Sequence, residues 1–187
     1  MKDKIILGSQ SPRRKVILEE AGFDVQILLA DIEENYPDDI EKADVPEYLA
    51  KLKMQHLPCN LDENIFIITA DTMLLFKDKL IGKPENTDEA FNMLSELNDT
   101  FHEVITGVCI KKNNKTISFS QKTKVYFKKM NLEEIKNFID THIVLDKAGA
   151  YNIQEYIGVD KIEGDFDNVA GLPIQTILEK IKNWNNL

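Results

Sequence analysis

Paired arginines stand where a helix is expected to begin, directly after a short loop rich in hydroxyl groups. The loop is Ser9-Gln10-Ser11, and Pro12, Arg13 and Arg14 follow it. Cations at an exposed helix start cost about 0.3–1 kcal/mol each, because the helix dipole is positive there. A bound anion held by backbone N–H groups and guanidinium forks removes this cost. The pattern fits a phosphate-binding site, and it fits equally well two exposed arginines without a ligand.

Carboxylates occur at two places that could serve such a site. Asp71 directly follows the apolar run Ile65–Ala70, and Glu33-Glu34 lies in an acidic loop. A carboxylate after a buried strand often lies where an α/β sheet opens its ligand crevice. Two carboxylates beside a phosphate would suit Mg²⁺ or Mn²⁺, which prefer oxygen ligands. The alternative is structural: Asp71 caps a turn, and the glutamates belong to a solvated charge run.

A lysine and a glutamine complete the residues that could do chemistry. Lys83 is held between Gly82 and Pro84, and Gln154 follows the segment Ala148–Ile153. Glycine and proline restrict the backbone around the lysine more than an ordinary surface lysine requires. A glutamine can pair with the edge of a base, although a buried glutamine bonded to the backbone is the more common case. The three histidines show no metal-ligand spacing, and we assign them no chemistry.

Composition limits the classes of protein that these residues can belong to. The 187 residues carry 23 Lys and Arg against 32 Asp and Glu, a net charge of -9. This acidity disfavours nucleic acids and anionic membranes as partners, so an anionic substrate would need a local basic pocket. No apolar run approaches the length of a membrane span or a signal-peptide core. Because Cys59 and Cys109 lie far apart in the sequence, we expect no disulfide framework. Taken together, these features predict a single, soluble, cytoplasmic domain over residues 1–187.

The elements that must position these residues alternate between strands and helices. A mixed α/β sheet with flanking helices is therefore the expected fold class. Strands are expected at Lys4–Gly8, Phe23–Leu29, Ile65–Ala70, Met73–Ile81 (as a hairpin), Val104–Lys111 and Lys115–Phe127, with strand character at Ala150–Gln154. Helices are expected at Pro12–Ala21, Pro46–Leu57, Thr87–Leu97, Asn131–Asp140 and from Leu172-Pro173 to about Trp184. The first helix is expected to turn Val16, Ile17 and Leu18 toward the core.

Five motifs occur in an order that resembles one known family. They are GSQSPRR at 8–14, TADT at 69–72, GKP at 82–84, DKAGAYNIQ at 146–154 and GLP at 171–173. The chain resembles the Maf-type nucleoside triphosphate pyrophosphatases across nearly its whole length. That resemblance implies an elongated α/β fold with a central cleft between two lobes, often assembled as a homodimer.

The resemblance also implies a reaction and the residues that perform it. The reaction is hydrolysis of a nucleoside triphosphate to the monophosphate and pyrophosphate with a divalent metal, Mg²⁺ or Mn²⁺. Asp71 takes the position of the proton acceptor, and Glu33 the acidic position that helps hold the metal. The phosphate-loop positions are Ser9, Arg13 and Arg14, and the lysines facing the triphosphate are Lys53 and Lys83.

Base selection follows from the branch of the family that the motifs match. Arg13, Thr72 and Gln154 are the residues typical of the dTTP/UTP branch, whose role is to clear such nucleotides, modified pyrimidines included, from the pool. The segment 152–155 lacks the glycines that usually flank the Ile-Gln pair, and Gly8 replaces the usual alanine. Two alternatives stay open: an inosine/xanthosine triphosphate pyrophosphatase, and a non-catalytic nucleotide-binding regulator of cell division.

Overall fold

The sheet is the frame of the molecule, which a computed structural model describes for residues 2–58, 62 and 64–186. Its strands are β1 (Lys4–Gly8), β2 (Asp24–Ile27), β3 (Phe66–Phe76), β4 (Lys79–Ile81), β5 (Phe101–Lys112), β6 (Lys115–Phe127) and β7 (Val159–Glu163). They form one seven-stranded sheet in the order β2-β1-β3-β5-β6-β7, with β4 paired to β3. β1 is parallel to β2 and β3, and the other pairs are antiparallel. The expected mixed α/β class is confirmed.

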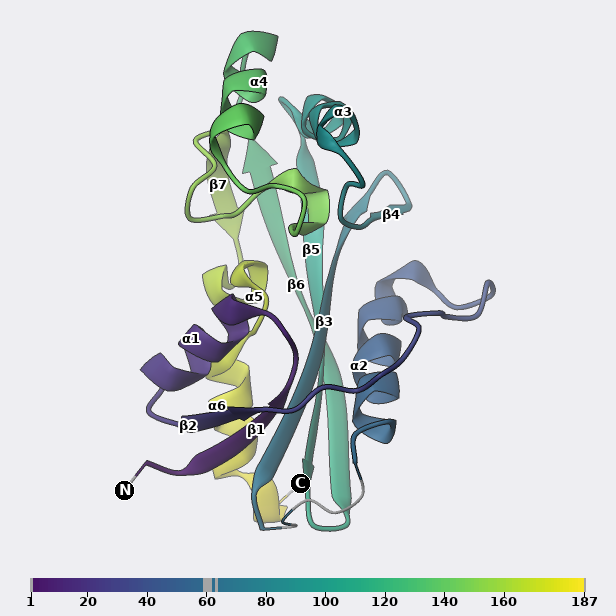
Figure 1. Ribbon diagram of the computed structural model, residues 1–187, viewed down its shortest axis with the longest axis vertical. Coiled ribbons are helices and arrows are strands. Elements are labelled where there is room, and N and C mark those ends of the chain that lie inside the picture. The colour runs from purple at the N-terminus through teal and green to yellow at the C-terminus, as the bar shows by residue number, and fades with distance from the viewer. Residues whose placement is uncertain (1, 59–61, 63, 187) are drawn as a thin grey trace.

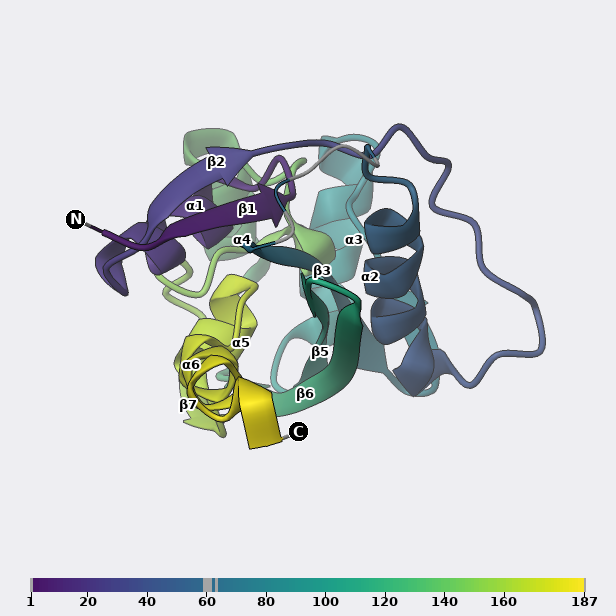
Figure 2. The same cartoon turned by 90° about the horizontal axis from the view of Figure 1, so that it is seen from below.

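Helices cover the two faces and the far end of this sheet. They are α1 (Pro12–Glu20), α2 (Val45–Gln55), α3 (Thr87–Leu97), α4 (Leu132–Thr141), α5 (Phe166–Ala170) and α6 (Ile174–Lys182), with short 3-10 turns η1 (Lys42–Asp44), η2 (Ala148–Ala150) and η3 (Trp184–Asn186). The long strands β3, β5 and β6 run through the elongated molecule and connect its two ends (Figure 1). Figure 2 shows α2 on one side of these strands and α1, α5 and α6 on the other.

The hydrophobic core is divided into three clusters, two on opposite faces of the sheet and one at its far end. Ile68 and Ala70 of β3 pack with Leu172 and Ile177 on the side of α1 and α6. Ile67, one residue away, packs instead with α2 on the opposite face. A third cluster fills the far end under α3 and α4. Because successive side chains of a strand point to opposite faces, β3 contributes residues to the core on both faces of the sheet.

The prediction that the central strand ends at Ala70 is wrong. β3 continues through Asp71 and Thr72, which lie opposite Gly107 and Thr106 in the ladder with β5. Polar residues can continue a strand where the neighbouring strand still provides hydrogen bonds. Asp71 is therefore held inside a rigid strand rather than at its loose end.

Several local predictions are confirmed and others are corrected. The hairpin of β3 and β4 turns at Lys77 and Asp78, both with positive φ, as tight hairpin turns require. Asn131 and Glu134 form the expected capping box of α4. The cap of α3 is Asn86 rather than Thr87, because its side chain accepts from the Glu89 N–H.

The segment 150–154 forms turns rather than the expected strand. Its backbone closes locally, with the N–H groups of Glu155 and Tyr156 donating to the Asn152 carbonyl. The strand of this region is β7, further along the chain. Its exposed and largely polar residues gave no apolar run by which to recognise it.

The remaining expectations concern membranes and cysteines. Within the described ranges, no helix is long and apolar enough to cross a membrane. Cys109 is buried on β5, and burial raises the pKa of its thiol to about 11. Cys59 lies outside the described residues.

Candidate active site

The edge of β3 changes partners halfway along the strand. β1 pairs with residues Phe66–Thr69, and β4 pairs with Leu74–Phe76. Between them, residues 70–73 have no strand neighbour on this edge in the described part of the chain. A sheet edge left open in this way exposes backbone groups that need other partners. Asp71 and Thr72 occupy this opening.

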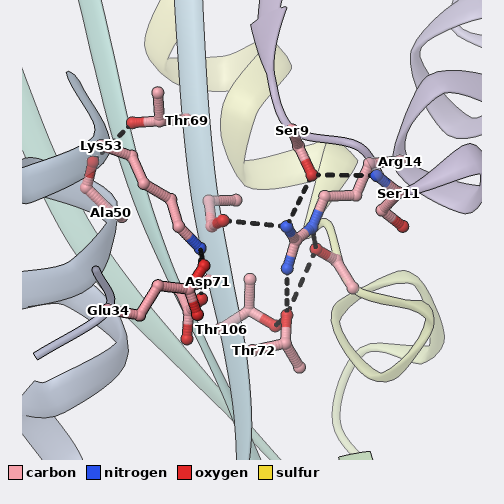
Figure 3. Close-up of polar contacts among 12 residues, drawn as sticks. Ser9, Ser11, Arg14, Glu34, Ala50, Lys53, Thr69, Asp71, Thr72 and Thr106 are labelled. Atoms are coloured by element: carbon pink, nitrogen blue, oxygen red, sulfur yellow. Dashed lines mark hydrogen bonds and ion pairs between the residues drawn. The ribbon is translucent and has the colours of Figure 1, made fainter. Parts of the chain in front are cut away.

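Alternation along β3 sends the two side chains to opposite faces of the sheet. Asp71 faces α2, as does Thr69, whose hydroxyl donates to the Ala50 carbonyl of that helix at 2.6 Å. Thr72 faces α1 and the segment after α5. Figure 3 shows the two groups of contacts on the two sides of the strand. One strand therefore supplies adjacent residues to two separate polar clusters.

The first cluster joins Lys53 of α2 to two carboxylates. Its ammonium Nζ lies 2.6 Å from Asp71 Oδ1 and 2.9 Å from Glu34 Oε1. Lys53 and Asp71 are largely buried, with side-chain exposures of 13% and 9%. Charge-assisted hydrogen bonds of this length fix the direction of both partners.

A close approach of two backbones sets the position of α2. Gly107 of β5 lies opposite Asp71 in the ladder. A Cβ atom at Gly107 would lie 2.1 Å from the Glu47 nitrogen at the start of α2. Only glycine lets the helix pack directly on the sheet here. This close packing of α2 on the sheet also brings Lys53, about two turns further along the helix, within reach of Asp71.

The second cluster is centred on the buried guanidinium of Arg14. Nη1 donates to the Ala70 carbonyl at 2.8 Å and to Ser9 Oγ at 2.9 Å. Nη2 donates to Thr72 Oγ1 at 2.9 Å, and Nε donates to the Gly171 carbonyl at 2.8 Å. The guanidinium thus takes the place of the missing strand beside β3 and connects it to the N-terminal loop and to the end of α5.

Ser9 is left with a defined hydrogen-bonding role. Its oxygen accepts from Arg14 Nη1 and from the Ser11 N–H, the latter at 3.2 Å. A hydroxyl has two acceptor lone pairs and one proton. With both lone pairs occupied, Ser9 can offer only its proton to a ligand.

A cavity of about 1000 Å³ opens over both clusters. Its lining combines residues of the N-terminal loop and β3 with residues from the far end of the molecule, which include Lys83 and the region of η2. The lining contains five lysines and arginines and five carboxylates: Arg13, Arg14, Lys53, Lys83 and Lys147, and Asp31, Glu34, Asp71, Asp146 and Glu155. The cavity is therefore electrically balanced although the chain carries a net charge of -9.

Most of the residues predicted from the sequence line this cavity. They are Ser9, Arg13, Arg14, Lys53, Asp71, Thr72 and Lys83. Glu33 and Gln154 do not: Glu33 is exposed and its Oε2 accepts from Asn35 Nδ2 at 3.0 Å. Gln154 is exposed too, and its backbone N–H donates to the Asn152 side chain.

The carboxylate that shares the Lys53 ammonium with Asp71 is Glu34, the neighbour of the predicted Glu33. Glu34 lines the cavity and Glu33 does not, although the lining before them runs without a break from Leu29 to Ile32. Burial works to raise the pKa of Glu34, but the hydrogen bond and charge of Lys53 outweigh it and hold that pKa below its usual value. The sequence offered both glutamates, and the contact with Lys53 distinguishes Glu34 from Glu33.

Arg13 of α1 and Lys147, which precedes η2, bring further cations to the cavity from elements distant in sequence. Partial burial lowers the pKa of Arg13, while the charges of Asp146 and Glu155 act in the opposite direction. Lys147 is largely buried and its ammonium pairs with the Asp146 carboxylate. Lys147 was not selected from the sequence, although it lies within the DKAGAYNIQ motif.

Comparison with known proteins agrees with the motif order. A family model described as "Maf-like protein" matches residues 4–184. A dTTP/UTP pyrophosphatase of Parabacteroides distasonis is 42% identical over 98% of this chain and 97% of that protein. A dTTP/UTP pyrophosphatase of Cytophaga hutchinsonii is 40% identical over 97% of this chain and 84% of that protein.

Among solved structures, the Ham1 protein of Staphylococcus aureus aligns with a TM-score of 0.36 and 15% identity, over 67% of this chain and 72% of that one. This score is too low to bear on fold or function. The match of the family model to nearly the whole chain is decisive. The chain belongs to the Maf-like protein family.

Proposed function

We propose that this protein hydrolyses dTTP and UTP to the monophosphate and pyrophosphate. The observation that carries the proposal is the Asp71 carboxylate, fixed by Lys53 in a cavity that also presents cations from several separate segments of the chain. The relatives named dTTP/UTP pyrophosphatase, aligned over nearly the full chain, support the same substrate.

Cleavage of a phosphoanhydride bond depends mainly on an in-line water and on compensation of phosphate charge. Asp71 is the proposed general base, because it is buried and bound by Lys53, whereas the other four carboxylates that line the cavity are exposed. Lys53 orients it by binding Oδ1, which leaves Oδ2 to accept a proton from water. Asp71 then carries that proton at the end of the attack.

The phosphate chain would be bound by donors on both walls of the cavity. Arg13 and Lys83 supply positive charge, and the Ser9 hydroxyl supplies its proton to a phosphate oxygen. Arg14 acts differently, because its four hydrogen bonds to the protein hold Ser9 and β3 in place. In the proposed mechanism Arg14 positions the phosphate loop rather than supplying the main phosphate contact.

A divalent cation fits the first cluster. Asp71 and Glu34 already place carboxylate oxygens around one cationic group, the ammonium of Lys53. No group of three or more metal-ligating side chains occurs among the described residues. Mg²⁺ commonly uses one or two carboxylates together with substrate phosphates and water, so Asp71 and Glu34 would hold it here. When bound, the metal neutralises charge on the phosphates, which a balanced cavity lining cannot do alone.

A release assay tests the proposed function directly. Purified protein is given dTTP, UTP, CTP, GTP and ITP with Mg²⁺ or Mn²⁺, and pyrophosphate and monophosphate are measured. We expect dTTP and UTP to be the preferred substrates, with equal amounts of the two products. Preference for ITP would favour the inosine/xanthosine class, and binding without pyrophosphate would favour the non-catalytic regulator.

Assembly, compartment and extent stay predictions within the same proposal. A homodimer, a cytoplasmic location and one catalytic domain over residues 1–187 are expected from the family resemblance and the sequence. Continuous passage of β3, β5 and β6 between the two ends of the molecule supports a single domain. Light scattering of the purified chain would give its mass in solution and test the dimer.

A further inference from the structure

Lys147 is a lysine buried in the wall of the cavity. The residue is 8% exposed, and it is among those that line the cavity. A buried ammonium is costly unless it is paired, and for that reason lysine is rarely found in such a place. A lysine here therefore depends on an anionic partner at all times, whether that partner is a side chain or a ligand.

Backbone contacts hold the segment that carries Lys147 against two other parts of the cavity wall. The Gly149 N–H donates to the Gly82 carbonyl at 2.9 Å, directly before Lys83. Gly149 has a φ of +69°, and a Cβ atom there would lie 2.4 Å from Leu74 Cδ2 of β3. Only glycine allows both the conformation and the close approach. Lys147 is thus carried by a segment fixed to the one that carries Lys83, a residue that the proposed function assigns to phosphate.

The carboxylate that pairs with Lys147 is far more exposed than the lysine is. The ammonium contacts the carboxylate of Asp146, and the two side chains are 11% and 58% exposed. An exposed carboxylate keeps most of its hydration and gains little from one ion pair. A buried ammonium left without a counter-ion loses much more. The pair can therefore open at low cost when another anion takes the place of the carboxylate, and only at high cost when none does.

Asp146 also lies within electrostatic reach of Arg13 on α1. Burial lowers the pKa of Arg13, and the charge of Asp146 is the largest of those that raise it, ahead of that of Glu155. Arg13 and Lys147 both line the cavity. One exposed carboxylate thus acts on two cations of the same cavity, and the proposed function already assigns the first of them to phosphate.

We propose that Lys147 is a further phosphate-binding residue, and that Asp146 is the counter-ion that a phosphate group displaces from it. The proposal rests on the function proposed above. A phosphate oxygen supplies the charge that the buried ammonium needs, and it accepts a charge-assisted hydrogen bond as a carboxylate does. Asp146 turns to water as the phosphate arrives. The carboxylate therefore competes with the nucleotide for the cation.

Lys147→Met tests the contact, because methionine keeps an unbranched chain and removes the ammonium. The Kd values of inorganic tripolyphosphate and of α,β-methylene UTP are measured by calorimetry. We expect both to rise by about tenfold to a hundredfold, the effect of one hydrogen bond to a charged group. Tripolyphosphate has no base and no sugar, so a similar rise for both ligands assigns the contact to phosphate. Lys147→Arg, which keeps the charge, should recover most of the loss.

Asp146→Asn tests the competition, and it changes an exposed side chain rather than the buried one. Both Kd values should fall by about twofold to fivefold, because the competing charge is weakened. The fall should shrink in the Lys147→Met background, where the cation that Asp146 competes for is absent. Asp31→Asn is the matched control, since it removes the same charge from the same cavity lining and should leave both values nearly unchanged.

Three results would overturn the proposal. They are an unchanged Kd for tripolyphosphate in Lys147→Met, a rise for the nucleotide analogue alone, and an equal effect of Asp146→Asn with and without Lys147. The binding measurements also separate this inference from the proposed reaction. If the wild-type chain releases no pyrophosphate, the proposed function fails, and the Kd values still test Lys147. If the chain hydrolyses UTP but Lys147→Met binds tripolyphosphate as the wild type does, only the present inference fails.

Discussion

The ammonium of Lys53 on α2 lies 2.6 Å from the carboxylate of Asp71 in the middle of β3. The two residues belong to different elements, and the helix can bring its lysine this close because Gly107 lets α2 pack on the sheet beside Asp71. The same ammonium contacts Glu34 at 2.9 Å. One cation thus fixes both carboxylates that the proposed reaction uses.

Lys53→Met is expected to lower kcat by about tenfold or more, because Asp71 loses the contact that orients it and faces Glu34 without a cation between them. The matched control is Lys51→Met on the same helix, whose lysine pairs with Glu47 at 2.7 Å outside the cavity lining. Steady-state pyrophosphate release compares the two variants. Equal kcat values for both would show that Lys53 does not orient the base.

Glu34→Gln is expected to raise the concentration of Mg²⁺ or Mn²⁺ needed for half-maximal activity, because one of two carboxylates near the metal is lost. Glu33→Gln should leave that concentration near the wild-type value, since Glu33 faces away from the cavity. Metal titrations of both variants at saturating nucleotide measure the effect. The reverse result would place Glu33, as the sequence resemblance implied, at the metal.

The two arginines at the start of α1 are expected to differ in what they support. Arg13→Gln should lower kcat/KM by about tenfold to a hundredfold through lost phosphate binding, with little change in stability. Arg14→Gln should lower the free energy of unfolding by about 3 kcal/mol or more, because buried carbonyls of Ala70 and Gly171 lose their donors. Urea unfolding and kinetics of both variants distinguish these roles. A stable Arg14→Gln protein would contradict the structural role of that guanidinium.

His102 is expected to make the folded state less stable in acid. It is 1% exposed, its Nε2 lies 2.8 Å from the Tyr151 hydroxyl, and burial lowers its pKa to about 3. The unfolded chain takes up a proton below about pH 6.5 while the folded protein does not, so stability is complete above that pH and falls toward pH 3.

At pH 5 this difference amounts to about 2 kcal/mol. Urea unfolding at pH 7.5 and pH 5 measures it, with His102→Gln as the variant that lacks the titrating group. The variant should lose less stability between the two pH values than the wild type. An identical loss in both proteins would mean that His102 does not titrate differently on unfolding.

The sequence predicted the parts of the site that reside in short motifs. The strand–loop–helix of 4–20, the hairpins and the capping box depend on local preferences, and they form as expected. Asp71, singled out from the sequence, lines the cavity, but the strand was expected to end there. The long ladder with β5 keeps it extended, and no local signal reveals that ladder.

Other differences arise where tertiary contacts decide which way a side chain points. The apolar residues of α1 were expected to face the core together, yet Val16 is 47% exposed and Arg14 is buried. Four hydrogen bonds made by the guanidinium, two of them to carbonyls distant in sequence, fix that rotation of the helix. Glu34 takes the place expected of Glu33 for a similar reason, since a contact with Lys53, distant in sequence, decides which of the two glutamates joins the cluster.

Asp71→Asn tests the central claim most directly. Pyrophosphate release from UTP and dTTP is measured alongside the free energy of unfolding, with Asp31→Asn as a control that removes another carboxylate from the cavity lining. Loss of a general base should lower kcat by about a hundredfold or more while the variant stays folded, and Asp31→Asn should keep most of its turnover. Substantial turnover by a folded Asp71→Asn protein would contradict the assignment of Asp71 as the base.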